Sequence, residues 1–372
     1  MEKLWKYKKI GEVCIVERGA SPRPIDKYIT DNESGINWIK IGDTSDSMYI
    51  TETAQKIIVE GMKKSRYVKP GDFLLSNSMS FGRPYILKID GCIHDGWLVL
   101  RDENALFDKR FLYYYLSSKT TYKKLKSMAV GGVVNNLNSE MVRNVIVPVP
   151  DKEEQSEIAD LFDKIKKILD DRKQELEQLD TLVKSRFVEL FGDPIKNPKG
   201  WEVVKLSECL ERIDNGKSFT CDSNAREGVF PAILKLSAAT YGDYRPYENK
   251  ALLDEKQFVE SVEVHRGDLL FTRKNTPDLV GMAAYVFETP EKLMMPDLIF
   301  RLVTNERMTP TFLWQLINNR EFRPAIQGIS GGSAKSMSNI SKERLKNIEV
   351  ICPPISEQKK LEGVLEQVDK SK

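Results

Sequence analysis

Serines, asparagines, lysines and arginines gather in loops that follow glycines. These residue types hydrogen-bond phosphates and the edges of nucleic-acid bases. The loops come in pairs, after Gly19 and Gly216, after Gly71-Asp72 and Gly267-Asp268, and after the two Gly-Gly pairs at 131–132 and 331–332. The side chains predicted to contact DNA are Ser21, Arg23, Lys40, Ser76, Asn77, Ser78, Arg83, Asn135, Asn136, Lys217, Ser218, Arg226, Lys235, Thr272, Arg273, Lys274, Asn275, Lys335 and Ser336. Taken singly, each residue is equally well explained as part of a solvated turn.

No catalytic constellation accompanies these loops. The two histidines, His94 and His265, have no His or Cys at metal-ligand spacing, and neither GxSxG nor GxGxxG occurs. GISGGSAKS at 328–336 resembles a phosphate-binding loop, but Ala334 stands where that loop needs glycine. We therefore predict no catalytic residue, no metal site and no cofactor bound by this chain.

The composition fits a globular protein, with 41% hydrophobic and 30% charged residues among 372. The five cysteines are scattered without a CxxC pair, which indicates reduced thiols and a cytoplasmic location. No apolar run reaches membrane-spanning length, and the first residues lack the apolar core of a signal peptide. The net charge is +2, but acidic residues dominate 151–190, so the remainder carries a positive excess that permits a polyanionic partner.

The chain repeats itself, because WKYKKIGEV at 5–13 matches WEVVKLSEC at 201–209, and FLYYYL at 111–116 matches FLWQLI at 312–317. Copies of about 190 residues are too long for a solenoid and indicate a duplicated domain. Short apolar runs predict strands in both copies, for example WIKIG, DFLLS, YILKI and WLVLR, then AILKL, DLLFT, AAYVF and LIFRLV. Helices are predicted near 109–118 and 310–319, the second with Thr309 as N-cap and Pro310 in its first turn.

We interpret Gly71-Asp72 and Gly267-Asp268 as turns that lead into a buried strand. Apolar and glycine positions agree between the copies, whereas polar loop residues differ. This pattern is expected for two domains that recognise different DNA sequences, and equally for sequence drift after duplication.

A long helix is predicted between the copies. Asp151 can cap it with Glu154 three residues later, and Gly192 and Pro194 end it. Some 39 residues would span roughly 58 Å. Its apolar residues alternate at three- and four-residue spacing, the pattern of a coiled-coil seam for pairing or subunit contact. The seam consists of Ile158, Phe162, Ile165, Leu169, Leu176, Leu179, Val183 and Phe187.

The corresponding helix after the second copy begins near residue 355 and is shorter. Antiparallel packing of the two helices would relate the copies by a pseudo-twofold axis, and parallel packing stays open. We expect a mixed α/β or α+β fold with recognition domains at 1–150 and 193–354 and spacer helices at 151–192 and 355–372.

This layout resembles the specificity subunit of type I restriction–modification enzymes over essentially the whole chain. The resemblance rests on ordered, duplicated motifs. They are Trp5, KPGDFL at 69–74, VPVP at 147–150 with Glu154-Gln155, then Trp201, RGDLL at 266–270 and CPP at 352–354 with Glu357-Gln358. It implies that each globule reads one half of a split DNA target. The helices would space the globules and dock two methyltransferase subunits, with restriction subunits joining outside. S-adenosylmethionine, ATP and Mg²⁺ would bind to the partners.

One departure concerns the short second helix, since spacer helices of this family are of comparable length. The uncovered part of the long helix, about 176–191, is therefore expected to pair with a methyltransferase subunit or with another specificity chain. Two alternatives remain on the sequence alone: a fused restriction or methylation enzyme, and a two-module scaffold that binds proteins.

Overall fold

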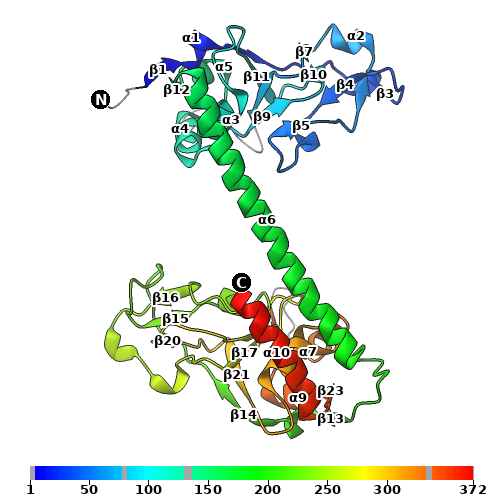
Figure 1. Cartoon of the computed structure of the whole chain (residues 1–372), viewed down its shortest axis with the longest axis vertical. Coiled ribbons are helices and arrows are strands. Elements are labelled where there is room, and N and C mark those ends of the chain that lie inside the picture. The colour runs from blue at the N-terminus through cyan, green and yellow to red at the C-terminus, as the bar shows by residue number, and fades with distance from the viewer. Residues whose placement is uncertain (1–4, 78–81, 130–135, 332–336, 372) are drawn as a thin grey trace. The chain divides into compact units, whose positions relative to one another are not determined.

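The computed structural model describes residues 5–77, 82–129, 136–331 and 337–371 (Figure 1). The chain divides into two compact units, Met1–Asp171 and Arg172–Lys372, called unit 1 and unit 2 here.

Unit 1 is a mixed α and β fold built around two sheets. Its strands are β1 (Lys6–Lys9), β2 (Ile15–Arg18), β3 (Ile29–Thr30), β4 (Ile36–Ile39), β5 (Tyr49–Ile50), β6 (Lys56–Ile57), β7 (Arg66–Val68), β8 (Phe73–Ser76), β9 (Pro84–Leu87), β10 (Gly91–Ile93), β11 (Trp97–Arg101) and β12 (Ile146–Val149). Its helices are α1 (Ile10–Val13), α2 (Val59–Met62), α3 (Lys109–Ser117), α4 (Lys119–Ala129) and α5 (Ser139–Arg143). The sheet orders are β2-β11-β8-β9-β5 and β3-β6-β4-β10-β7, and β1 pairs separately with β12.

Unit 2 repeats this plan. Its strands are β13 (Val203–Lys205), β14 (Leu210–Asn215), β15 (Ala232–Leu234), β16 (Asn249–Ala251), β17 (Leu269–Thr272), β18 (Lys274–Asn275), β19 (Ala283–Tyr285), β20 (Leu293–Met294), β21 (Ile299–Thr304), β22 (Ser338–Asn339) and β23 (Glu349–Ile351). Its helices are α7 (Pro310–Asn318), α8 (Arg323–Gly328), α9 (Lys342–Lys346) and α10 (Ile355–Ser371).

The strand pairing confirms the duplication. The order β14-β21-β17-β19 matches β2-β11-β8-β9, and the parallel pair β15–β20 with antiparallel β16 matches β4–β10 with β6. In each unit the first strand pairs antiparallel with the strand before the closing helix, β1 with β12 and β13 with β23. The predicted strands and both predicted helices are confirmed, including the Thr309 cap, whose Oγ1 accepts a hydrogen bond from the Phe312 amide at 3.2 Å.

The long helix α6 (Lys152–Phe191) is one unbroken element of 40 residues, drawn in green in Figure 1. Asp151 Oδ1 accepts from the Glu154 amide at 2.9 Å, and Gly192 ends the helix at a positive φ of 78°. The start of α6 packs on the core of unit 1 through Ile158, and its last turns lie in the core of unit 2.

The predicted seam does not form one continuous buried stripe. Val183 and Phe187 are buried in unit 2, in a cluster shared with Leu361, Leu365 and Val368 of α10, so their predicted role in binding other subunits is wrong. Phe162, Ile165, Leu169 and Leu176 are exposed, and Leu179 packs against the same cluster of unit 2. The antiparallel coiled coil of α6 and α10 stays a prediction.

A buried glutamine fastens the closing helix of each unit. Gln155 Oε1 accepts from the Asp108 amide at 2.8 Å, and its Nε2 donates to the carbonyls of Leu106 (3.0 Å) and Pro150 (2.9 Å). Gln358 repeats all three bonds, with the Thr309 amide (2.8 Å) and the carbonyls of Arg307 (2.9 Å) and Pro353 (2.7 Å). Asp108 and Thr309 cap α3 and α7, so the glutamines tie the start of one helix to the start of another.

Candidate nucleic-acid interface

The Gly-Asp turns are structural, as predicted. Gly71 and Gly267 have φ of 89° and 93°, a region that favours glycine. Asp72 accepts from the Lys69 amide at 3.0 Å and lies 3.3 Å from Arg101 Nε. Asp268 accepts from the His265 amide at 2.9 Å and lies 3.0 Å from Arg301 Nε. Each turn therefore starts a buried strand, β8 or β17, and is held there by an arginine of the neighbouring strand.

Ser76 and Thr272 do not face solvent, which corrects their prediction as DNA contacts. Both are fully buried at the ends of β8 and β17. The Ser76 hydroxyl accepts from the Arg83 amide at 2.9 Å, and the Thr272 hydroxyl accepts from the Met282 amide at 2.9 Å. In both copies, therefore, a buried hydroxyl accepts a hydrogen bond from the returning chain and closes the hairpin.

Two asparagines are corrected for the same reason. Asn77 is 1% exposed and its Nδ2 donates to the Asp95 carbonyl at 2.7 Å. Asn275 is also buried, and its Nδ2 donates to the Thr240 hydroxyl at 3.2 Å. A buried amide that is already paired within its own unit does not present its edge to DNA.

Other predicted residues do reach the surface. Lys217 and Ser218 are exposed, and Arg83, Asn136, Arg226, Arg273 and Lys274 are half-buried. Arg83 pairs with Asp46 at 3.1 Å, and Arg273 lies over the ring of Phe300. Arg226 donates to the carbonyls of Phe230 and Glu291, and burial lowers its pKa. Ser78, Asn135, Lys335 and Ser336 lie outside the described residues.

The structure brings Ser21, Arg23 and Lys40 together in unit 1, around a cavity of about 270 Å³. Asp95 joins them, because its Oδ1 accepts from the Ser21 hydroxyl at 3.0 Å and its Oδ2 pairs with Arg23 at 3.3 Å. Lys40 Nζ donates to Gln55 Oε1 at 2.7 Å. Gly19 leads into this site, and a Cβ there would lie 2.2 Å from the His94 carbonyl oxygen, so only glycine fits. Gly216 is restricted in the same way by the Pro296 carbonyl at 2.0 Å.

The pKa values of Asp95 and His94, two titratable groups of this cavity, are both shifted by their surroundings. Burial alone would raise the pKa of Asp95, but the Ser21 hydrogen bond, the charges of His94 and Arg18 and the Arg23 hydrogen bond bring it below its ordinary value of 3.8. Burial lowers the pKa of His94, whose ring lies edge-on to buried Trp38 at 6.4 Å. A carboxylate, two basic side chains, an amide and an imidazole beside an indole can hydrogen-bond a planar group with donors and acceptors, such as a base edge.

Sequence analysis considered His94 only as a metal ligand, although the residues that correspond to His94-Asp95 in the second copy are Pro296-Asp297. That difference between the copies was itself the available signal. Trp38 and Gln55 gave no separate signal, since one reads as a core residue and the other as a loop residue.

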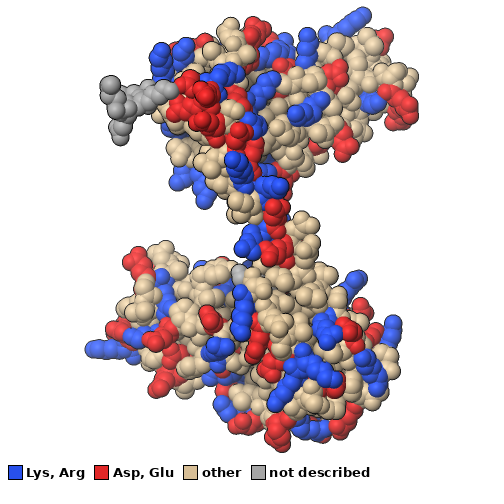
Figure 2. All heavy atoms as spheres, viewed as in Figure 1, with Lys and Arg blue, Asp and Glu red and all other residues tan. Residues whose placement is uncertain are grey.

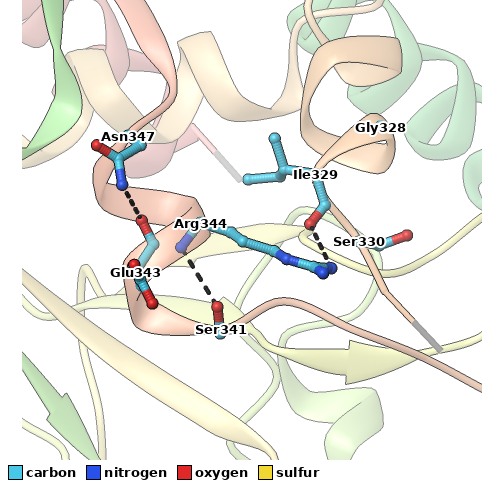
Figure 3. Close-up of a pocket in the computed structure, with 7 residues that line it drawn as sticks. All are labelled: Gly328, Ile329, Ser330, Ser341, Glu343, Arg344 and Asn347. Atoms are coloured by element: carbon cyan, nitrogen blue, oxygen red, sulfur yellow. Dashed lines mark hydrogen bonds between the residues drawn. The ribbon is translucent and has the colours of Figure 1, made fainter.

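In unit 2 the counterpart of Lys40, Lys235, also precedes a one-turn 3-10 helix and pairs with Glu248 at 3.7 Å. A cavity of about 580 Å³ lies elsewhere in unit 2, beside α9 (Figure 3). There Arg344 Nη1 points to the Ile329 carbonyl at 3.5 Å, and the Ser341 hydroxyl accepts from the Arg344 amide at 3.3 Å. Gly328, Ile329, Ser330, Ser341, Glu343, Arg344 and Asn347 line it, and none of them was predicted.

Sequence reasoning also missed a lysine-rich helix. Within α4, exposed lysines surround buried Leu125. They are Lys119, Lys123, Lys124 and Lys126. Blue side chains lie at the edge of unit 1 where α4 runs (Figure 2). The matching helix α8 has the sequence RPAIQG and carries no lysine.

Among the described residues, no group of three or more His, Cys, Asp or Glu side chains could hold a metal ion. None of the described helices has the length and apolar character needed to cross a bilayer.

Comparison with known families decides the class of protein. The model of the type I restriction modification DNA specificity domain matches residues 2–179 and again 198–372. The chain belongs to this family. Two specificity domains in tandem agree with the duplication seen in the sheets.

Relatives of this specificity subunit span bacteria and archaea. The specificity subunit of the type I enzyme EcoEI from Escherichia coli is 30% identical over 46% of this chain and 30% of its own length. The MjaVIII specificity subunit from Methanocaldococcus jannaschii is 22% identical over 98% of this chain and 86% of its own.

A solved specificity subunit from M. genitalium shares the fold. It has a TM-score of 0.58 and 13% identity, and the match covers 100% of this chain and 90% of that one. The family match favours DNA specificity over the alternatives of a fused enzyme and a protein-binding scaffold, since these relatives are named specificity subunits.

Proposed function

We propose that this chain is the non-catalytic subunit that selects the DNA target of a type I restriction–modification complex, with unit 1 and unit 2 each reading one half of a bipartite sequence. The observation that carries the proposal is the duplication of one scaffold with different exposed polar groups. The sheets, the Gly-Asp turns and the helix-fastening glutamines are the same in both units. The cavity around Asp95 and the lysines of α4 are features of unit 1, whereas Arg273 and Lys274 mark unit 2.

The proposed contacts divide into two kinds. Arginines and amides at the loops would read base edges, and lysines would bind phosphates without reading sequence. The exposed and half-buried candidates are Ser21, Arg23, Lys40, Arg83, Asn136, Lys217, Ser218, Arg226, Lys235, Arg273 and Lys274. To these we add Asp95 and the four lysines of α4.

The remaining parts would assemble the complex. We divide the chain into recognition domains at 1–150 and 193–354 and spacer helices at 151–192 and 355–372. The exposed apolar residues of α6 support the docking of methyltransferase subunits, two in number, and restriction subunits would join the assembly. S-adenosylmethionine, ATP and Mg²⁺ would be held by those partners, and the complex would act in the cytoplasm. Pairing of α6 with a second specificity chain would compete with methyltransferase docking.

Methylome sequencing tests the proposal. Cells that express this chain with its methyltransferase partner should acquire methylation at one bipartite motif. Arg273→Ala should relax the motif in one half only, at a cost of about 1–3 kcal/mol for a bidentate base contact. A motif without two halves, or a change in both halves, would contradict the proposal.

A further inference from the structure

Two thiols meet in the core of unit 2. The Cys209 thiol donates a hydrogen bond to the sulfur of Cys352 across 3.8 Å, and the two residues lie 143 positions apart in the chain. Both cysteines are free, and they are 0% and 7% exposed. A disulfide joins two sulfurs at about 2 Å, so a small movement of the side chains would bring this pair to bonding distance.

Unit 1 has valines at both matching positions. The sequence repeat aligns Val13 with Cys209, and counting back from the buried glutamines aligns Val149 with Cys352. Val13 and Val149 both pack in one apolar core cluster of unit 1. The duplicated scaffold therefore folds with apolar side chains here, and it does not require the thiol groups of unit 2.

An arginine accompanies the two thiols. The backbone carbonyl of Arg307 lies 3.5 Å from the Cys352 sulfur. The Arg307 guanidinium pairs with the carboxylates of Glu202 at 2.8 Å and Glu208 at 3.4 Å. Leu106 matches Arg307 in unit 1, because the buried glutamine of each unit donates to the carbonyl of that residue. Unit 2 thus has two thiols and a cation where unit 1 has three apolar residues.

The surroundings activate one of the two thiols. The hydrogen bond from Cys209 and the charge of Arg307 lower the pKa of Cys352 to about 7, against the opposing effect of burial. The pKa of Cys209 is raised, because its thiol donates that hydrogen bond. Burial raises the pKa of the other three cysteines, Cys14, Cys92 and Cys221. Cys352 is therefore the cysteine with thiolate character at neutral pH, and the thiolate is the reactive form.

We propose that Cys209 and Cys352 form a peroxide-sensitive dithiol, which closes to a disulfide under oxidation and is reopened by exchange with a reducing dithiol. The Cys352 thiolate attacks one oxygen of hydrogen peroxide, the O–O bond breaks, and the leaving hydroxide takes up a proton to give water. The Cys209 sulfur then attacks the sulfenic acid, the S–O bond breaks, and a second water leaves with the Cys209 proton. The two thiols lose two electrons and the peroxide gains them. Disulfides in reducing compartments are usually of this transient, redox-sensing kind.

The bond would fasten both ends of unit 2 to each other. Cys209 follows the 3-10 turn Leu206–Glu208 after the entry strand β13, and Cys352 follows the exit strand β23. Closing so long a loop restricts the unfolded chain, so the melting temperature of unit 2 should rise by about 4–16 °C. Unit 1, which has valines at the matching positions, should melt as before.

Hydrogen peroxide and the full chain supply the test. The chain is reduced with dithiothreitol, desalted and treated with peroxide in small molar excess, and its thiols are then counted by maleimide labelling in denaturant. Peroxide should lower the count from five to three, and dithiothreitol should restore five. Peptide mapping should join Cys209 to Cys352, and calorimetry should show the higher melting temperature of unit 2 in the oxidised chain.

Three variants separate the roles of the residues. Cys209→Ser should stop at the Cys352 sulfenic acid, which dimedone traps. The double change Cys209→Val and Cys352→Val copies unit 1, and its melting temperature should not respond to peroxide. Cys221→Ser is the matched control, because it removes the only cysteine that is not buried and should leave disulfide formation unchanged.

Three results would overturn the proposal. They are five remaining thiols after peroxide treatment, a disulfide between any other pair, and an unchanged melting temperature once the bond has formed. The thiol count and the peptide map use the unaltered chain, so they decide the matter even where a variant fails to fold. Neither measurement involves DNA binding or methylation, so the proposed function is tested separately.

Discussion

Changing Gln155 to leucine should destabilise unit 1 and loosen its attachment to α6. Leucine nearly matches the volume of glutamine but makes none of the three hydrogen bonds, to the Asp108 amide and to the carbonyls of Leu106 and Pro150. The side chain is 0% exposed, so water does not replace the lost partner at that position. One amide and two carbonyls are left with fewer partners in a buried place.

The magnitude follows from those groups. A buried polar group without a partner costs about 1–3 kcal/mol. With one amide unpaired and two carbonyls left with fewer partners, we expect a loss of about 2–5 kcal/mol in the free energy of unfolding. Gln358→Leu should cost unit 2 a similar amount, because it breaks the same three bonds.

Urea unfolding followed by circular dichroism gives the stability, and hydrogen exchange with mass spectrometry gives the location. In the Gln155→Leu chain, exchange should rise over 106–118 and stay unchanged over 307–319, and Gln358→Leu should give the reverse. Gln174→Leu is the matched control, because Gln174 is exposed on α6. A loss below about 0.5 kcal/mol, or faster exchange in the unaltered unit, would refute the reasoning, since a surface substitution costs no more than that.

Four further changes test other parts of the structure. Gly267→Ala should lower stability by about 1–2 kcal/mol through its positive φ alone, because its Cβ would meet no atom within 4 Å. Gly216→Ala should lower the melting temperature further through its 2.0 Å clash with Pro296, and equal losses would contradict this. Changing Lys119, Lys123, Lys124 and Lys126 together to glutamine should reduce the slope of log affinity against log salt by up to about 3.6, at 0.9 for each phosphate, in DNA binding by the assembled complex. An unchanged slope, or a changed methylated motif, would count against phosphate contact. Because the pKa of Asp95 lies below 3.8, its carboxylate stabilises unit 1 fully above that pH and loses the contribution as pH falls through the lower folded value. Asp95→Asn should remove this part of the acid dependence, measured by circular dichroism, and Asp297→Asn in unit 2 is the matched control.

Much of the fold was predictable because its signals are local or duplicated. Apolar runs bounded by glycine and aspartate mark β8 and β17, and the cap and the terminal glycine mark α6. The site was less predictable, because burial depends on the whole unit. Ser76 and Thr272 have the residue types of DNA contacts, yet the hairpins that follow them draw their hydroxyls inward. The heptad pattern of α6 predicted one continuous surface for a partner. In the structure the start of the helix packs on the core of unit 1 and its end on the core of unit 2. Spacing along a helix shows which residues share a face but not which neighbour covers it.

The pairing of β1 with β12 and of β13 with β23 has a consequence for change over generations. The chain leaves each unit beside the strand through which it entered. All residues between the two paired strands therefore form a closed circuit, meaning a segment whose two ends are held together by that two-stranded sheet. An insertion or replacement inside that circuit need not move the sheet, provided that the core still packs. The buried glutamine of each closing helix bonds only the backbone at the start of α3 or α7 and the proline just before its own helix. Target preference can therefore be exchanged within one circuit without altering α6, and a new half-site need not cost the subunit its partners.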